Sequence, residues 1–186
     1  MVDHTDDVVV LLDEDAKPVG TAPRASVHGR HTPLHLAFSC YLFDAAGRVL
    51  MTRRSVAKKT WPGVWTNSFC GHPRPGEAAE EAVARHARHE LGIDVRDVRC
   101  VLPRFRYHAV DASGVEENEV CPVFVATFAT EAGAIDANPD EVAEWRWLTT
   151  GELSSAVAAA PWALSPWLLE QHAQLQRLDR WTVGPR

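Results

Sequence analysis

The residues of this chain best suited to chemistry are three histidines and two glutamates that stand in three separate stretches. They are His28, His35, His72, Glu117 and Glu119. In an extended strand, residues two apart project from the same face, so Glu117 and Glu119 would present two carboxylates together. Two such carboxylates repel each other unless a cation or a proton lies between them. Imidazole nitrogens and carboxylate oxygens suit a six-coordinate divalent ion, so the set predicts a site for Mn²⁺ or Mg²⁺, with Zn²⁺ a further candidate.

These residues also have an ordinary structural interpretation. The chain has nine histidines, and a histidine taken alone is more often a surface or hydrogen-bonded residue than a metal ligand. Cys70 would share a strand face with His72, but a cysteine taken alone is more often a small buried hydrophobe than a catalyst. Spacing alone leaves both interpretations open.

A short basic cluster could hold a small anion. Arg53, Arg54, Lys58 and Lys59 lie within seven residues of each other. If the cluster stood alone, a solvated basic turn would be the simpler interpretation. The formal net charge of -6 at pH 7 disfavours broad nucleic-acid binding, because that mode needs a basic surface facing the phosphates.

Strands and turns that could position these residues are visible in the hydrophobic pattern. Strands are predicted at residues 8–12, 36–43, 49–51, 101–110, 115–128 and 144–147. Turn residues at 44–47 and 111–114 join neighbouring strands, which predicts two hairpins.

A helix is predicted in the stretch without glycine or proline that follows Gly76. Apolar residues recur there at every fourth position, at Ala79, Val83, Ala87 and Leu91. The stripe predicts a helix that ends at Gly92. The tail from Leu153 to Leu178 is rich in Ala, Leu and Trp but contains Pro161 and Pro166, so two helical pieces are expected there.

Length and composition predict one domain over residues 1–186, since 46% hydrophobic residues in 186 provide one substantial core. Strands and helices do not alternate strictly, which favours an α+β sandwich. The apolar run 8–12 is too short to cross a bilayer and follows acidic residues, so neither membrane insertion nor export is expected. The four cysteines form no CxxC pair, which is typical of free thiols in the cytoplasm.

The segment from Gly71, GHPRPGEAAEEAVARHARHELGI, resembles the Nudix box G-x5-E-x7-R-E-U-x-E-E-x-G-U, in which U is apolar. It matches at Gly71, Glu77, Arg85, Glu90, Gly92 and Ile93. His86 and His89 stand where Nudix hydrolases have glutamates that hold the metal ions of diphosphate hydrolysis. Positions 86, 89 and 90 share one helix face, so only Glu90 remains of that acidic cluster. The departure argues against hydrolysis.

Five further motifs, in order, resemble type I isopentenyl diphosphate isomerases. They are LHLAFS at 34–39, TRR with KK and then WPGVWTNSFCGHP within 52–73, ENEVCPVF at 117–124 and PWALSPW at 161–167. Several motifs in one order are far more specific than the degenerate box alone, and the resemblance covers about residues 5–170. It implies a Nudix-like α/β/α sandwich with a mixed sheet and a C-terminal helical extension.

The resemblance also implies roles for individual residues. The family converts isopentenyl diphosphate to dimethylallyl diphosphate with an acid and a base on opposite faces of the carbon skeleton, which correspond to Cys70 and Glu119. In the family, Tyr107 hydrogen-bonds near the glutamate and Trp167 lies against the carbocation, although core packing is an alternative for Trp167. One divalent ion is held by the three histidines and two glutamates identified above.

The diphosphate has its own expected contacts. A second ion, Mg²⁺, would bridge it to Glu90. Arg54 and Lys58 would bind the remaining charge. Arg24 could assist, where some relatives carry lysine; an arginine keeps the charge but offers a planar fork in place of a point donor.

Two other functions are consistent with parts of the pattern. A Nudix hydrolase of a nucleoside or other diphosphate is favoured by Arg85 and Glu90 but opposed by His86, His89 and Cys70. A ligand-binding or regulatory Nudix domain without catalysis is expected to have lost the Cys, Glu and metal-binding residues. The sequence retains all of them.

Overall fold

The computed structural model describes residues 7–129, 134–178 and 181–182, and their strands form two sheets. The first has the order β2–β1–β3–β10–β9. Its strands are β1 Val8–Leu12, β2 Pro18–Pro23, β3 His35–Leu36, β9 Arg106–Val110 and β10 Glu116–Val120. The second has the order β12–β5–β4–β11–β8, with β6 paired to β5 and β7 to β4. Its strands are β4 Phe38–Phe43, β5 Val49–Arg54, β6 Trp65–Thr66, β7 Phe69–Gly71, β8 Val95–Leu102, β11 Val123–Phe128 and β12 Val142–Leu148. The pairs β3–β10 and β4–β11 are parallel, so both sheets are mixed.

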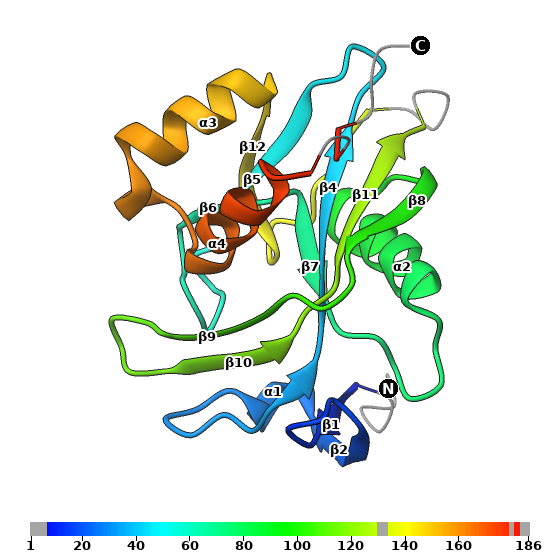
Figure 1. The fold of residues 1–186 in the computed structure, drawn as a ribbon, viewed down its shortest axis with the longest axis vertical. Coiled ribbons are helices and arrows are strands. Elements are labelled where there is room, and N and C mark those ends of the chain that lie inside the picture. The colour runs from blue at the N-terminus through cyan, green and yellow to red at the C-terminus, as the bar shows by residue number, and fades with distance from the viewer. Residues whose placement is uncertain (1–6, 130–133, 179–180, 183–186) are drawn as a thin grey trace.

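Helices lie on both faces of the second sheet, with α2 on one face and α3 and α4 on the other (Figure 1). The helices are α1 Arg24–Val27, α2 Ala79–Leu91, α3 Thr150–Ala159, a 3-10 turn at Pro161–Ala163 and α4 Pro166–Leu175. Phe38 and Leu42 of β4 pack with α2, whereas Tyr41 and Phe43 pack on the side of α4. A strand covered on both faces needs a nearly continuous apolar sequence, and FSCYLF fits this pattern except at Ser39.

The predicted strand 36–43 is divided between the two sheets. β3 ends at Leu36 and β4 begins at Phe38. The Ala37 N–H donates to the Val120 carbonyl and the Ser39 N–H to the Pro122 carbonyl, so the chain keeps the same neighbour while it crosses between sheets. Hydrophobic pattern does not reveal this division, because both halves remain extended.

The second predicted hairpin makes the same crossing. Its turn is confirmed, because β9 and β10 are antiparallel with Tyr107 opposite Glu119. Its arms then continue into β8 and β11, which pair in the second sheet. Pro122, which has no N–H for a ladder, lies between β10 and β11. The first hairpin is confirmed near its turn, where Phe43 pairs with Val49.

Strand 8–12 and the two helical pieces of the tail are confirmed, while the strand predicted at 144–147 is longer and runs over Val142–Leu148. The sequence pattern missed β2, α1, β6 and β7. The last two are strands of two and three residues, too short for a period to show. In the described part of the chain, no helix has both the length and the apolar character needed to span a bilayer.

Helix α2 ends where the pattern predicts. Gly92 has a φ of 65°, in the left-handed region, and its N–H donates to the Arg88 carbonyl. A Cβ at this position would lie 2.8 Å from the Asp136 carbonyl oxygen. The glycine is therefore required both by its conformation and by the close approach of another segment.

We predict that Gly92→Ala lowers the free energy of unfolding by more than the about 1–2 kcal/mol that left-handed backbone costs a residue with a Cβ. The additional loss should come from displacement of the Asp136 backbone. Gly76→Ala is the matched control, because Gly76 has a φ of 76° but no atom within 4 Å of the added Cβ. Urea unfolding of both variants measures the difference, and equal losses would show that the contact with Asp136 has no role.

Candidate functional site

The residues expected to bind metal and substrate gather around one cavity of about 660 Å³. Those that line it are Arg24, His28, Arg54, Lys58, Cys70, His72, Glu90, Tyr107, Glu117, Glu119 and Trp167. His35 is fully buried behind the wall, against Glu119. Tyr107 and the two glutamates belong to strands of the first sheet and Cys70 to β7 of the second, so the cavity lies where the sheets meet.

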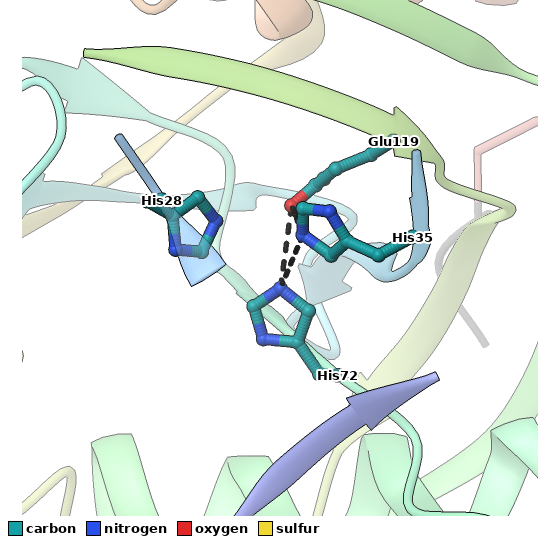
Figure 2. Close-up of side chains that lie close together, drawn as sticks. All are labelled: His28, His35, His72 and Glu119. Carbon is teal, nitrogen blue, oxygen red and sulfur yellow. Dashed lines mark hydrogen bonds and ion pairs between the residues drawn. The ribbon is translucent and has the colours of Figure 1, made fainter. Parts of the chain in front are cut away.

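Three imidazoles and one carboxylate converge at one side of this cavity, and Figure 2 shows these four side chains. The ligand atoms of His28, His35, His72 and Glu119 all lie within 4.8 Å of one another. The Nε2 atoms of His35 and His72 are 3.2 Å apart, and Glu119 Oε1 lies 3.4 Å from the first and 3.3 Å from the second. Neighbouring ligands of a six-coordinate ion with bonds of about 2.1 Å are about 3 Å apart, so the spacing fits a divalent ion.

Glu117 lies beside this group, against His28. Its Oε2 atom is 3.0 Å from His28 Nε2, yet these two buried atoms make no hydrogen bond. Its other oxygen, Oε1, accepts a hydrogen bond of 2.6 Å from the Thr60 hydroxyl. A buried polar atom without a partner is costly, so this unpaired nitrogen and oxygen also fit a cation held between them.

His35 is held in the orientation that a ligand needs. Its Nδ1 lies 2.9 Å from the Pro33 carbonyl oxygen. A carbonyl can only accept, so Nδ1 carries a proton and Nε2 is the nitrogen that would bind a metal. The parallel pairing of β3 with β10 places His35 next to Glu119.

The electrostatics of the group favour a carboxylate anion. Burial raises the pKa of Glu119, but hydrogen bonds with His35 and His72 and their charges outweigh burial and hold that pKa well below its usual range. Burial lowers the pKa of His72. Burial also acts to lower the pKa of His35, but the contacts with Glu119 prevail and raise it. A buried carboxylate in this setting needs a positive charge beside it, from a proton or from a cation.

Cys70 lies on another wall of the cavity, opposite Ser39 in the β4–β7 pairing. Its Sγ atom is 3.3 Å from Asn67 Oδ1 and 3.3 Å from Ser39 Oγ. Burial raises the pKa of the thiol to about 11, although the hydrogen bonds and the charge of Arg54 lower it. Cys70 is therefore a protonated thiol in this structure.

Two aromatic residues also line the cavity, Tyr107 opposite Glu119 on the neighbouring strand and Trp167 beside the Asn67 side chain that contacts Cys70. Trp167, at the start of α4, has its ring centroid 5.6 Å from that of Tyr107, and its indole N–H donates to Asn67 Oδ1 at 3.1 Å. Burial raises the pKa of Tyr107 well above its usual range, with the charges of Glu119 and Glu117 adding to the effect. The phenol therefore stays protonated.

Basic side chains line a further part of the cavity. Arg54 places its guanidinium carbon 5.3 Å from the centroid of the Trp167 ring and donates to the carbonyl and hydroxyl of Thr60 at 2.8 and 3.0 Å. The Lys58 ammonium forms an ion pair with Glu141. Burial lowers the pKa of Lys58, the direction expected for a cation in a half-closed site.

Arg24 and Glu90 also line the cavity, each with a partner. Arg24 Nε lies 2.8 Å from Asp7 Oδ1, and both side chains are about half exposed. Glu90 Oε1 lies 3.1 Å from His86 Nδ1, one helical turn earlier on α2. Position 86 is one of the two at which the Nudix box is altered.

Sequence reasoning missed three residues that support the site, namely Ser39, Thr60 and Asn67. Ser39 contacts Cys70 and Thr60 contacts Glu117, and both partners are distant in sequence. Asn67 contacts the nearby Cys70, but its amide also has partners elsewhere in the chain. The spacing of residues in the sequence therefore does not reveal these roles. Of the three, only Ser39 could have been found from the sequence, since it is the one polar residue that interrupts the apolar run FSCYLF.

Comparison with known proteins agrees with this geometry. The model of the NUDIX domain matches residues 33–168. An isopentenyl-diphosphate Delta-isomerase of Clavibacter michiganensis is 57% identical over 92% of this chain and 86% of its own length. One of Mycolicibacterium vanbaalenii is 56% identical over 98% of this chain and 97% of its own length.

Among solved structures, DR0079 from Deinococcus radiodurans has the same fold. It superposes with a TM-score of 0.69 at 22% identity, over 91% of this chain and 99% of its own. The α+β arrangement is thus that of NUDIX proteins, as the motifs predict. With identities above half over nearly its whole length, the chain belongs to the isopentenyl-diphosphate Delta-isomerase family of NUDIX-domain proteins.

Proposed function

We propose that this protein converts isopentenyl diphosphate to dimethylallyl diphosphate, in isoprenoid biosynthesis. The observation that carries the proposal is the position of Cys70 and Glu119, which line one cavity together with cations suited to a diphosphate. The names and identities of the relatives support the same reaction. A cytoplasmic location is part of the proposal, supported by four cysteines that are all free thiols.

Glu119 and Cys70 exchange protons with opposite faces of the substrate. Addition of a proton to the terminal alkene carbon leaves a tertiary carbocation, and removal of a proton from the neighbouring carbon on the other face forms the new double bond. One proton enters and one leaves, so no oxidant or reductant is needed. In this structure Glu119 is an anion and Cys70 a protonated thiol, so Glu119 must take up a proton before it can act as the acid.

His28, His35, His72, Glu117 and Glu119 would hold a divalent ion, Mn²⁺ or Mg²⁺, with Zn²⁺ a further candidate. When bound, such an ion withdraws electron density from the carboxyl group and strengthens it as an acid. Thr60 and the Pro33 carbonyl orient two of the ligands. Their contacts support a preformed site.

The diphosphate lies against Arg54 and Lys58, with Arg24 assisting. Glu90 would hold a second ion, Mg²⁺, which would supply further positive charge for the diphosphate. Lys58 already pairs with Glu141, so the substrate shares this cation with the carboxylate. Trp167 and Tyr107 face the carbon skeleton between the acid and the base, where an indole face stabilises a developing positive charge.

The hydrolase alternative is not favoured. The relatives carry the isomerase name, and the helix face that would hold the catalytic metal ions of a hydrolase has His86 and His89 beside Glu90. Hydrolysis driven by metal ions on this helix face gives no role to the thiol of Cys70.

In heavy water, the protein should produce dimethylallyl diphosphate that carries deuterium and should release no phosphate. Deuterium enters because the proton delivered to carbon comes from a side chain that exchanges with solvent. Mass spectrometry and a phosphate assay on the same sample measure both products. Phosphate without isomer would favour the hydrolase.

His72→Ala should weaken binding of Mn²⁺ by more than the roughly 10–100-fold that loss of an outer-shell partner costs, because a direct ligand is removed. Isothermal titration measures the affinity, and turnover should be lost while the protein stays folded. His108→Ala is the control, since His108 is half exposed on β9 and outside the converging group. Unchanged Mn²⁺ affinity in His72→Ala would remove the residue from the site.

Substitution of Trp167 separates its two interpretations. If the indole stabilises the carbocation, Trp167→Phe keeps an aromatic face and should lose little turnover, whereas Trp167→Leu keeps bulk but loses the face and should be much slower. The Michaelis constant should change little, because Arg54, Lys58 and Glu90 bind the diphosphate. If the indole only packs, turnover should follow stability in both variants. Parental turnover in fully folded Trp167→Leu would contradict the cation role.

A further inference from the structure

A chain of polar side chains crosses the core between β4 and α4. Ser39, Tyr41 and Gln171 are all fully buried. Ser39 and Tyr41 are two apart on β4, so they share the face toward α4, which carries Gln171. The Tyr41 hydroxyl donates to Gln171 Oε1 at 3.0 Å, and Gln171 Nε2 donates to Ser39 Oγ at 2.9 Å.

In the amide orientation of this structure, the hydrogen bonds of the chain run in one direction. Because Gln171 uses its carbonyl for Tyr41, its N–H faces Ser39, and the Ser39 oxygen is an acceptor in that bond. The Ser39 proton must then be donated elsewhere. Two sulfur atoms lie within reach, Cys70 Sγ at 3.3 Å and Cys121 Sγ at 3.4 Å.

The other side-chain partner of Cys70, Asn67, can only accept. Its Nδ2 atom donates to the carbonyl oxygens of Cys40 and Phe69 at 3.0 and 2.9 Å. Its Oδ1 atom receives the indole N–H of Trp167 as well as the Cys70 thiol. The amide is therefore locked, with its oxygen toward the sulfur. That orientation suits a thiol and offers no hydrogen to a thiolate.

Catalysis by Cys70 requires a donor at the sulfur. Whether Cys70 donates or accepts the proton, its side chain is a thiolate at one point of each turnover. This anion is mostly buried. A hydrogen bond to an anion is stronger than one to a neutral thiol, so the Ser39 hydroxyl turns to Cys70 rather than Cys121 when the charge forms.

We propose that Ser39, oriented by Gln171 and Tyr41, is a positioning residue that donates a hydrogen bond to the Cys70 sulfur and stabilises its negative charge during isomerisation. The inference rests on the proposed role of Cys70 and extends it to a network inside the core. Packing alone gives no reason for such a network, because apolar residues of similar shape would fill the same space at equal or lower free energy.

The test compares Ser39→Ala with Tyr41→Phe in the full chain, with isopentenyl diphosphate as substrate. Loss of one donor to an anion should lower kcat by about tenfold to a hundredfold in Ser39→Ala, with little change in KM. Tyr41→Phe keeps the ring but frees the Gln171 amide, so a smaller fall in kcat is expected. Ser154→Ala is the control. It removes a 3.1 Å contact between α3 and His172 of α4 without touching Cys70, and should keep the parental kcat where it is folded.

A second pair of variants tests the inference if Ser39→Ala does not fold. Ser39→Thr and Ser39→Val have the same shape and the same strain in the core, but only threonine retains the hydroxyl. Threonine should keep a clearly higher kcat than valine at matched stability. Equal kcat in this pair, or parental kcat in folded Ser39→Ala, would overturn the inference.

Cys70→Ala separates this inference from the proposed function. An inactive Cys70→Ala beside a fully active Ser39→Ala would refute the role of Ser39 alone. If Cys70→Ala itself kept parental turnover, the catalytic role of Cys70 would fail, and the proposal for Ser39 with it.

Discussion

The site depends on one topological constraint, the simultaneous passage of two neighbouring strand segments from one sheet to the other. β3 continues into β4 and β10 into β11, and each pair is parallel on both sides of the crossing. The first half of the crossing brings His35 beside Glu119. The second half places Ser39 opposite Cys70 through the pairing of β4 with β7. The carboxylate and the thiol therefore reach one cavity because the chain changes sheets between them.

Charge is divided along the walls of that cavity. Glu117 and Glu119, with three imidazoles, provide an electron-rich site for a cation. Arg54 and Lys58 provide positive charge for an anion. The cavity is also lined by groups that carry no charge. They are the aromatic rings of Trp167 and Tyr107 and the thiol of Cys70. This arrangement suits a substrate that has an anionic end and an uncharged hydrocarbon end.

Much of this organisation could be predicted from the sequence, and the failures have a common physical cause. Helix α2 and its end at Gly92 follow from a local period and a local backbone need, and β1 follows from a short apolar run. The residues proposed to bind metal could be chosen by their chemistry, although only the fold brings His35 and Glu119 together. The break at Ala37 could not be predicted, because it is set by hydrogen bonds to Val120, more than eighty positions away. Thr60 was missed for the same reason, since its partner Glu117 is 57 positions away. Asn67 is only three positions from Cys70, but its partners Cys40 and Trp167 come near it only after folding.

In the proposed mechanism, helix α4 contributes to the chemistry as well as to the core. It supplies Trp167, whose indole shares the Asn67 oxygen with the Cys70 thiol, and Gln171, whose amide reaches Ser39. The residues of the proposed metal site lie outside this helix. Partial detachment of this helix would therefore stop the proposed reaction while the sheets and the proposed metal site stay folded. We expect thermal inactivation to come before global unfolding.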